Sequence, residues 1–256
     1  MKKKLIRYLL IPVVSLIVLL FAFNAFPEIT KEDKTYIRAF LGEWKFSDSS
    51  AGIHKNFDTE IEFISRLQDS VVQNVRHSFN AYSDLGDIKY YYDTRKGYCY
   101  DRAAMLEKFL MYFDFKIRHI YIYFDKNKPT LGVADFFREN LSSHAILEVK
   151  TQKGWMVMGT NSNWLGWQND GQPLTIFAVR KKIREGDIQL KKVGHLGAGK
   201  PFFEDLPYPG QFKIVYGVYS RHGQFLTSRP VESGLKAVGL RSPFPDYNLR
   251  MLLSNF

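Results

Sequence analysis

Apolar residues in the first half of the chain recur with a helical period. Residues 31–45 (KEDKTYIRAFLGEWK) predict a short amphipathic helix, which ends at the polar loop SDSSAG. Residues 57–79 predict a longer helix with Asp58 as its N-cap, because apolar side chains recur there every three or four positions. A third helix is predicted from about residue 99 to Phe113.

The second half of the chain changes to alternating stretches rich in β-branched and aromatic residues, which are typical of strands. Strands are predicted at residues 117–124 (IRHIYIYF), 144–150 (HAILEVK), 155–159 (WMVMG), 174–180 (LTIFAVR) and 212–220 (FKIVYGVYS). The residues TQKG between the second and third strands predict a hairpin turn. Because the helices precede the strands, the pattern predicts an α+β fold with an antiparallel sheet.

The chain divides into four parts. We predict an N-terminal segment, a linker with a short helix, a globular core and an extended tail at residues 1–27, 28–56, 57–220 and 221–256. The tail contains three prolines and is expected to wrap over the core. No internal repeat or low-complexity segment interrupts the core.

The N-terminal segment has the layout of a signal peptide or a short membrane anchor. Three lysines and Arg7 precede an apolar run over residues 8–23. The small-residue pattern for cleavage is poor, because Phe23 lies two residues before Ala25, so an uncleaved anchor is favoured. Positive residues stay in the cytoplasm, which places residues from about 28 onward outside, on the periplasmic side in a Gram-negative cell.

The composition is that of a packed domain without disulfides. The chain has 256 residues, 45% of them apolar and 16% aromatic, which is ample for a core. A single cysteine excludes an intramolecular disulfide. The net charge of +10 falls to +6 without the four N-terminal cations, and favours a solvated basic surface or an anionic partner. No nucleic-acid partner is expected, because no basic block with interleaved aromatic residues occurs outside the N-terminal segment.

The one cysteine, Cys99, lies where the third helix is predicted to begin. Gly97 allows a sharp turn before it, and the unpaired amides of a helix start favour a thiolate, the form that attacks carbonyl carbon. The same amides are suited to hold a developing oxyanion. The alternative is that Cys99 is a small buried side chain with no chemical role.

A histidine and an amide are candidate partners for this thiol. Alternation places His144 at the start of a predicted strand, where an imidazole can take and return the thiol proton. His119, on the preceding strand, is a second candidate. If the hairpin turns at Gln152 and Lys153, His144 lies opposite Asn161, whose amide is suited to orient the ring. The alternative is that the residues TNSN are simply a turn after the strand.

These segments together resemble the transglutaminase-like superfamily of papain-fold cysteine enzymes. GYCYDRAAMLEKFL resembles the superfamily's cysteine-bearing helix start, and FKIRHIYIY resembles the strand that follows. SHAILEV and KGWMVM complete the match, which covers residues 57–165 in order. The resemblance implies a papain-like core with the cysteine helix packed on an antiparallel sheet, and it implies Cys99 as nucleophile and His144 as base.

The third member of the superfamily's triad is not matched. The superfamily pattern has an aspartate four residues after the tryptophan, where this chain has Gly159. Asn161 is the nearest residue on the same face that can substitute, while Asp170 lies in a polar loop. For the oxyanion we consider three upstream side chains, each of which is alternatively a packing residue: Tyr91, Tyr92 and Tyr98.

Other motifs do not indicate a cofactor. The segment GHLGAGKP (residues 194–201) nearly matches a phosphate-binding loop, but Pro201 replaces the hydroxyl residue, so we interpret the segment as an ordinary loop. Asp101 and Arg102 are expected to cap or pair locally. No metal-binding motif occurs, and neither a metal nor another cofactor is expected.

Two functions from different classes remain open. The first is a membrane-anchored, extracytoplasmic cysteine hydrolase or acyltransferase, which acts on an amide of an envelope protein or peptide through Cys99, His144 and Asn161. The second is an inactive module of the same fold that binds a partner at the membrane surface. The glycine at position 159 motivates the second.

Overall fold

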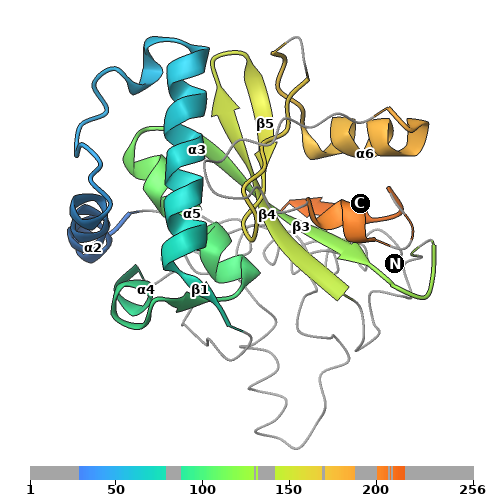
Figure 1. Cartoon of the computed structure of the whole chain (residues 1–256), viewed down its shortest axis with the longest axis horizontal. Helices are drawn as coiled ribbons and strands as arrows, with labels where there is room; N and C mark the ends of the chain where they lie inside the picture. The colour runs from blue at the N-terminus through green and yellow to red at the C-terminus, as the bar shows by residue number, and fades with distance from the viewer. Residues whose placement is uncertain are drawn as a thin grey trace, which may run out of the picture.

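A four-stranded antiparallel sheet lies between a group of helices on one face and a single helix on the other (Figure 1). The strand order is β5-β4-β3-β6. The computed structural model describes residues 29–78, 88–129, 131, 142–168, 171–187, 201–206, 208 and 210–216.

Within these residues the helices precede most of the strands. The helices are α2 (Lys31–Glu43), α3 (Phe57–Asn74), α4 (Ile88–Thr94), α5 (Cys99–Tyr112) and α6 (Ile176–Glu185), with short 3-10 turns η1 (Ile53–Lys55) and η3 (Phe202–Asp205). The strands are β1 (Arg76–His77), β2 (Lys96–Gly97), β3 (Lys116–Phe124), β4 (Ser142–Thr151), β5 (Gly154–Met158) and β6 (Lys213–Tyr216). The predicted α+β architecture is therefore confirmed, as a layer of helices on an antiparallel sheet.

The two faces of the sheet bury different apolar clusters. Ala145 and Leu147 of β4 pack with α2, α3 and α5, in the cluster that also contains Cys99. The intervening Ile146 packs on the other face, together with α6. This alternation along β4 follows from the two-residue period of a strand, and it means that β4 is buried on both sides.

The hairpin predicted from TQKG is confirmed. Thr151 pairs with Gly154, so Gln152 and Lys153 form the two-residue turn, and Leu147 pairs with Met158 at the far end of the ladder. Gly154 has a φ of 143°, a conformation that side-chain-bearing residues rarely adopt. This is the predicted register. If the pairing continued beyond Leu147, position 161 would lie opposite His144.

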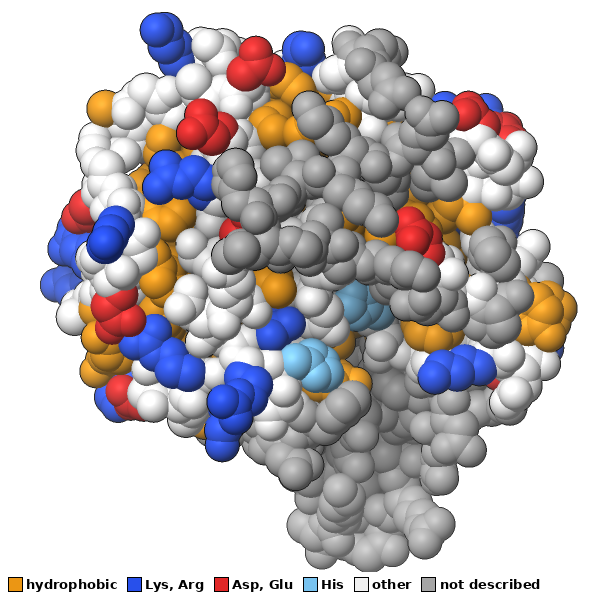
Figure 2. Space-filling view, in the orientation of Figure 1, with side chains coloured by type: hydrophobic (Ala, Val, Ile, Leu, Met, Phe, Trp, Pro, Cys, Tyr) orange, Lys and Arg blue, Asp and Glu red, His pale blue; other side chains and the backbone are white. Residues whose placement is uncertain are grey.

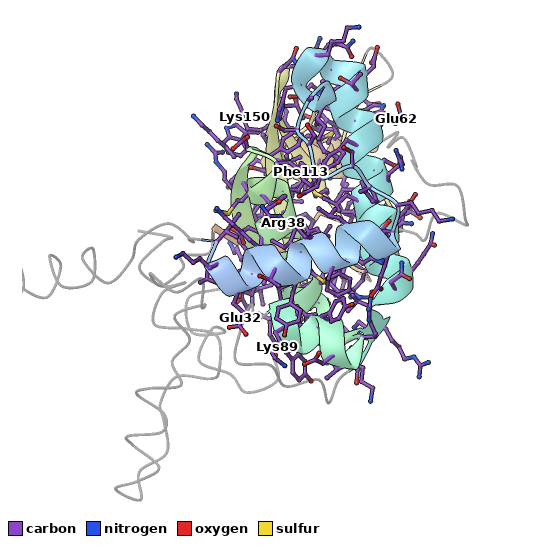
Figure 3. All side chains as sticks on the ribbon, turned by 90° about the vertical axis from the view of Figure 1, so that its left-hand side faces the viewer. Glu32, Arg38, Glu62, Lys89, Phe113 and Lys150 are labelled. Atoms are coloured by element: carbon purple, nitrogen blue, oxygen red, sulfur yellow. The ribbon has the colours of Figure 1, made fainter. Side chains whose placement is uncertain are left out.

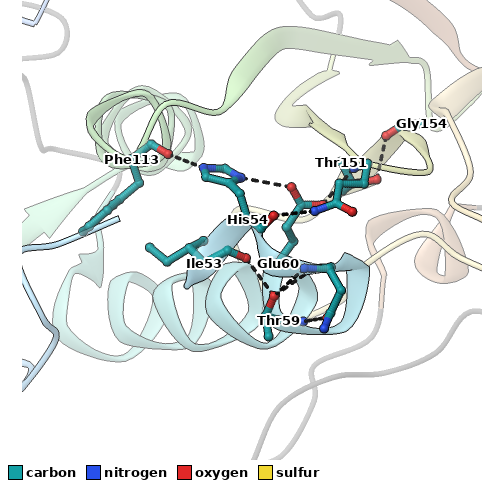
Figure 4. A network of polar contacts seen from close by, with 9 residues as sticks. Ile53, His54, Thr59, Glu60, Phe113, Thr151 and Gly154 are labelled. Atoms are coloured by element: carbon teal, nitrogen blue, oxygen red, sulfur yellow. Dashed lines mark hydrogen bonds and ion pairs between the residues drawn. The ribbon is translucent and has the colours of Figure 1, made fainter. Parts of the chain in front are cut away.

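A polar network ties this turn to the helical side of the molecule (Figure 4). The buried carboxylate of Glu60 accepts from the backbone amide of Gln152 at 2.8 Å and contacts Nδ1 of His54 at 3.0 Å. Nε2 of the same ring is 2.8 Å from the carbonyl oxygen of Phe113. One imidazole therefore joins η1, α3, the end of α5 and the hairpin turn.

Helix α2 is fastened to α5 by a buried ion pair. Nζ of Lys108 lies 2.8 and 2.9 Å from the two carboxylate oxygens of Asp33, and both side chains are almost fully buried. Asp33 is also the N3 residue of a capping box with Thr30. Figure 3 looks onto α2, where Arg38 and Glu32 are labelled, and shows it lying across the helices behind it. The short helix predicted at residues 31–45 thus packs directly on the core.

Two predictions of local structure were wrong. The N-cap of α3 is Asn56, which forms a capping box with Thr59, whereas Asp58 lies within the first turn. Residues 174–180 begin a helix rather than a strand. Thr175 caps α6 by accepting from the amide of Ala178, and Gly186 ends the helix in a left-handed conformation. The alternation over seven residues was too short to reveal that Ile176, Val179 and Ile183 share one helical face.

Several predictions concern residues outside the described part of the chain. The N-terminal segment 1–27, the tail 221–256 and most of the loop 194–201 are among them. Among the described helices, none has both the length and the apolar character needed to cross a bilayer.

Candidate active site

Cys99 is the first residue of α5, as the sequence predicted. The carboxylate of Asp101 caps this helix, because it accepts from the amide of Tyr98 at 2.7 Å and from the hydroxyl of Tyr91 at 2.8 Å. Gly97 is closely packed, since a Cβ there would lie 3.0 Å from Cβ of Asp101 and 3.2 Å from Val75. The helix start therefore sits tightly against the end of α3.

Burial dominates the acidity of the thiol. Cys99 is 5% exposed, and this burial raises its pKa to about 11. Hydrogen bonding from the backbone amides of Ala145 and Tyr100 lowers the pKa, but by less than burial raises it. Burial thus opposes the thiolate that the helix start was expected to favour, and with a pKa of about 11 the thiol is neutral at pH 7.

The thiol occupies a gap where the β4–β5 ladder has opened. In a two-residue hairpin, alternate residues from Thr151 back to Ala145 direct their N–H and C=O groups toward β5. The ladder stops at Leu147, and Ala145 keeps its carbonyl paired only through the hydroxyl of Thr160. The amide of Ala145 instead faces Cys99. The sulfur therefore takes a position that a continued strand would fill.

His144 is the residue immediately before this amide. Its side chain is partly exposed, yet burial of the ring and, as a smaller cause, the charge of the nearby His77 together lower its pKa to about 4. The imidazole is consequently neutral at pH 7 and able to accept a proton. His144 directly precedes Ala145, the residue whose amide faces the sulfur, so the imidazole belongs to the same end of β4 as the gap.

Asn161 lies in a tight loop after β5 and not in a continued strand. The loop is closed by a hydrogen bond from the amide of Gly159 to the carbonyl of Trp164, and the buried Gln68 donates to both of their carbonyls. The side-chain oxygen of Asn161 accepts from Nη1 of Arg102 at 3.4 Å. The turn interpretation of TNSN is thus confirmed, and a role of Asn161 toward His144 stays a prediction.

Position 159 has no room for the aspartate of the superfamily pattern. A Cβ on Gly159 would lie 2.3 Å from Nε1 of Trp164 and 2.5 Å from the carbonyl oxygen of Ser162. The space next to the strand end is filled by the indole, which is completely buried. The loop has therefore been built around a glycine.

The other candidates from the sequence separate clearly. Tyr91 is buried and donates to Asp101, and the hydroxyl of Tyr92 is hydrogen-bonded to Glu43, so both have structural roles away from the thiol. Tyr98 precedes Cys99. Burial raises the pKa of Tyr98, and the charge of the Cys99 thiolate is a second, smaller cause of the increase. His119 is fully buried beside Glu107, 3.4 Å away, and burial lowers its pKa well below the ordinary value.

The sequence did not single out His77, and it treated Arg102 only as a local partner of the helix start. His77 lies in β1 opposite Gly97, and its ring centroid is 5.1 Å from that of Tyr98. Arg102 lies one turn after Cys99 and is 5% exposed. A two-residue strand carries no periodic signal, so only the folded chain reveals the position of His77.

The comparisons agree with this architecture. Residues 48–160 match the family model described as the transglutaminase-like superfamily, so this part of the chain is similar to that superfamily. The predicted resemblance is therefore confirmed. The match ends next to Asn161 and includes Cys99, His144 and Gly159.

Single-protein comparisons are less informative. A solved structure from Cytophaga hutchinsonii, provisionally described as a cysteine protease, is 13% identical over 76% of this chain and 50% of its own. Its TM-score is 0.37, and this chain spans half of that protein's length. A comparison with curated proteins found no match. Among the described residues, no cluster of three His, Cys, Asp or Glu side chains is arranged to hold a metal ion.

Proposed function

We propose that this protein is a cysteine hydrolase or acyltransferase that acts on an amide bond, with Cys99 as nucleophile and His144 as base. The observation that supports it best is the opened ladder, which leaves the amide of Ala145 facing the sulfur, one residue from the imidazole. A strand end that delivers a backbone donor and a neutral base to one thiol is suited to acyl transfer.

The reaction begins with the thiol of Cys99 and the imidazole of His144 both neutral. Sγ of Cys99 attacks the carbonyl carbon of the substrate while its proton passes to a ring nitrogen of His144. Backbone amides near the sulfur, which include those of Tyr100 and Ala145, stabilise the negative oxygen that forms. The C–N bond then breaks, the imidazolium gives its proton to the departing amine, and a thioester remains on Cys99.

The second half returns the thiol. Water or an amine attacks the thioester carbon and gives a proton to His144. The C–S bond breaks, the proton returns to the sulfur, and an acid or a new amide leaves. The amide of Asn161, which accepts from Arg102 in the structure, is proposed to turn to the imidazole and orient it during these steps.

The proposed setting is the outer side of a membrane. Residues 1–27 have the charge and apolar pattern of an uncleaved anchor, so the substrate is expected to be an envelope protein or peptide. The intact mass of the mature protein tests retention of the anchor. A mass lacking the first 20 to 30 residues would replace the anchor with a cleaved signal peptide.

The chemistry is tested by trapping the thioester. The full-length chain is incubated with a mixed peptide library and hydroxylamine, and hydroxamates and hydrolysed amides are detected by mass spectrometry. We expect products that iodoacetamide abolishes, that fluorophosphonates spare, and that Cys99→Ala and His144→Ala both lose. Arg38→Gln, which changes an exposed side chain of α2, is the matched control and retains activity. Products that persist in Cys99→Ala would end the proposal.

A second function has its own support. Trp164 fills the space that a side chain at position 159 would need, and the pKa of the thiol is high. Both observations favour a non-catalytic binding module of the same fold. In that case Cys99→Ser would fully restore the phenotype of cells that lack the protein. If Cys99→Ser is expressed normally but does not restore the phenotype, the result contradicts the binding module and favours the enzyme.

A further inference from the structure

Arg102 is a buried cation that is held by backbone groups. Its Nε donates to the carbonyl of Val75 at 2.9 Å, and Nη2 contacts the same oxygen and the carbonyl of Val72 at 3.4 Å. These carbonyls end α3, where a positive charge is favoured by the helix dipole. The guanidinium is thereby fixed in position, with its Nη1 edge directed at Asn161.

This cation has no carboxylate partner in the described part of the chain. No Asp or Glu there forms an ion pair with Arg102, and the adjacent Asp101 accepts instead from Tyr91 and the amide of Tyr98. Burial lowers the pKa of Arg102 to about 10, which reflects the cost of an unneutralised charge in this place. The Cys99 thiolate, when formed, is the one acidic group that raises this pKa.

One further basic side chain interacts with the guanidinium, and a second interacts with the first. His77 is placed by the pairing of β1 with β2, and the charge of Arg102 lowers its pKa in addition to burial. His77 in turn affects His144, so the three basic groups border the region of the thiol. On this face of the molecule, two histidine side chains gather with Lys or Arg side chains beside them (Figure 2).

We propose that Arg102 and His77 form a binding site for a carboxylate carried by the substrate, next to the thiol of Cys99. The long contact from Nη1 to the neutral amide of Asn161 is then exchanged for a bond to the carboxylate, in which donor and acceptor both carry a charge. The role of this site in selecting substrates rests on the proposed function, but the binding of an anion near Cys99 does not.

The single cysteine permits a direct test. Second-order rates of Cys99 alkylation are measured with iodoacetate and with iodoacetamide, which differ in charge at one position, and their ratio is divided by that of N-acetylcysteine. We expect the corrected ratio to exceed one by about tenfold in the wild type. Arg102→Gln and His77→Gln are expected to bring it close to one. Arg38→Gln, which removes the same charge from the surface, leaves it unchanged.

The test does not depend on one variant. Arg102→Gln loses the hydrogen bonds to the carbonyl of Val75 and could for that reason fail to fold. In that case the corrected ratios of His77→Gln and of the wild type test the proposal. Acetate should slow iodoacetamide alkylation of the wild type several-fold relative to chloride at equal ionic strength. A corrected ratio of one in the wild type, or no protection by acetate, would overturn the proposal.

The two proposals can fail separately. A raised ratio without amide chemistry would keep the anion site and remove the enzyme. Amide chemistry with a ratio of one would keep the enzyme and remove the anion site.

Discussion

The indole nitrogen of Trp164 lies 2.3 Å from the point where a Cβ on Gly159 would stand. The two residues belong to one loop, which Gln68 closes by donating to the carbonyls of both. A missing aspartate at position 159 is therefore accompanied by a rebuilt neighbourhood, and the loop itself would have to move to accept one.

Restoring the aspartate is expected to fail. Gly159→Asp should lower the free energy of unfolding by about 1 to 3 kcal/mol, because the new side chain overlaps Trp164 and the carbonyl of Ser162. Thermal unfolding measures the loss, and hydroxamate formation should not increase. Gly42→Ala is the matched control, since nothing lies within 4 Å of a Cβ there. A Gly159→Asp variant with wild-type stability and enhanced turnover would show that the indole of Trp164 can move aside at little cost in free energy.

The thiol should titrate late. With a pKa of about 11, the Cys99 thiolate is about 100-fold scarcer at pH 7 than for a thiol of pKa 9. We expect the rate of alkylation by iodoacetamide to rise about tenfold per unit up to about pH 10, followed by mass spectrometry. His144→Ala should leave this profile unchanged, because the ring is already neutral. A plateau below pH 8 that disappears in His144→Ala would instead reveal a thiolate–imidazolium pair.

Activity should have an acid limb near pH 4. His144 must be neutral to accept the thiol proton, and its pKa is lowered to about 4 by burial and by His77. The rate of amide cleavage is therefore expected to fall as the pH drops through 4. His77→Gln removes one of the two causes and should move this limb to higher pH. A limb near pH 6.5 in the wild type would contradict the environment described for this ring.

The His54 network should make stability depend on pH. Burial lowers the pKa of His54, but hydrogen bonds to Glu60 and to the carbonyl of Phe113, with the charge of Glu60, raise it overall. Both partners are acceptors, so only the protonated ring satisfies both. A raised folded-state pKa gives stability that is complete below the unfolded value of about 6.5 and is lost as the pH rises through the folded value.

This dependence is measured with His54→Gln. The melting temperature of the variant should fall further below that of the wild type at pH 5.5 than at pH 9. Lys55→Gln, at the exposed neighbouring position, should show the same small difference at both pH values. An equal loss at both pH values in His54→Gln would mean that the network acts without protonation.

The buried pair between Lys108 and Asp33 should be costly to break. Lys108→Met leaves the carboxylate buried without its cation and is expected to lower the free energy of unfolding by about 3 kcal/mol. Urea unfolding measures the difference. Asp93→Asn, which breaks an exposed pair with Lys89, should have a far smaller effect. A loss for Lys108→Met no larger than that of the control would show that α2 is held by apolar packing alone.

The elements with long periodic patterns were predictable from the sequence. Helices α3 and α5 and the β4–β5 hairpin follow from apolar spacing and from the turn TQKG, which also gave the correct register of the hairpin as far as Leu147. Residues 174–180 were not predictable in this way, because a short apolar run satisfies both periods and only the caps at Thr175 and Gly186 decide for a helix.

The candidate site was predictable in its order but not in its electrostatics. The sequence located Cys99 at a helix start and His144 on a strand, yet it did not reveal that burial raises the pKa of the thiol. It also did not reveal His77, which two residues of strand bring beside Tyr98. Both effects depend on contacts between distant segments, on which spacing along the chain carries no information.

The amide of Ala145 can either extend the β4–β5 ladder or face the sulfur of Cys99, but it cannot do both. A backbone pair between Ala145 and Thr160, the next hydrogen-bonded pair of the β4–β5 ladder beyond Leu147, would withdraw this donor from the sulfur, so the hairpin cannot lengthen without changing the environment of the thiol. Engineering aimed at a more regular hairpin, such as a strand-forming substitution in the loop after Met158, is thus a means of switching the thiol off. Selection for a reactive Cys99 would conversely keep this loop irregular and the sheet one pair short.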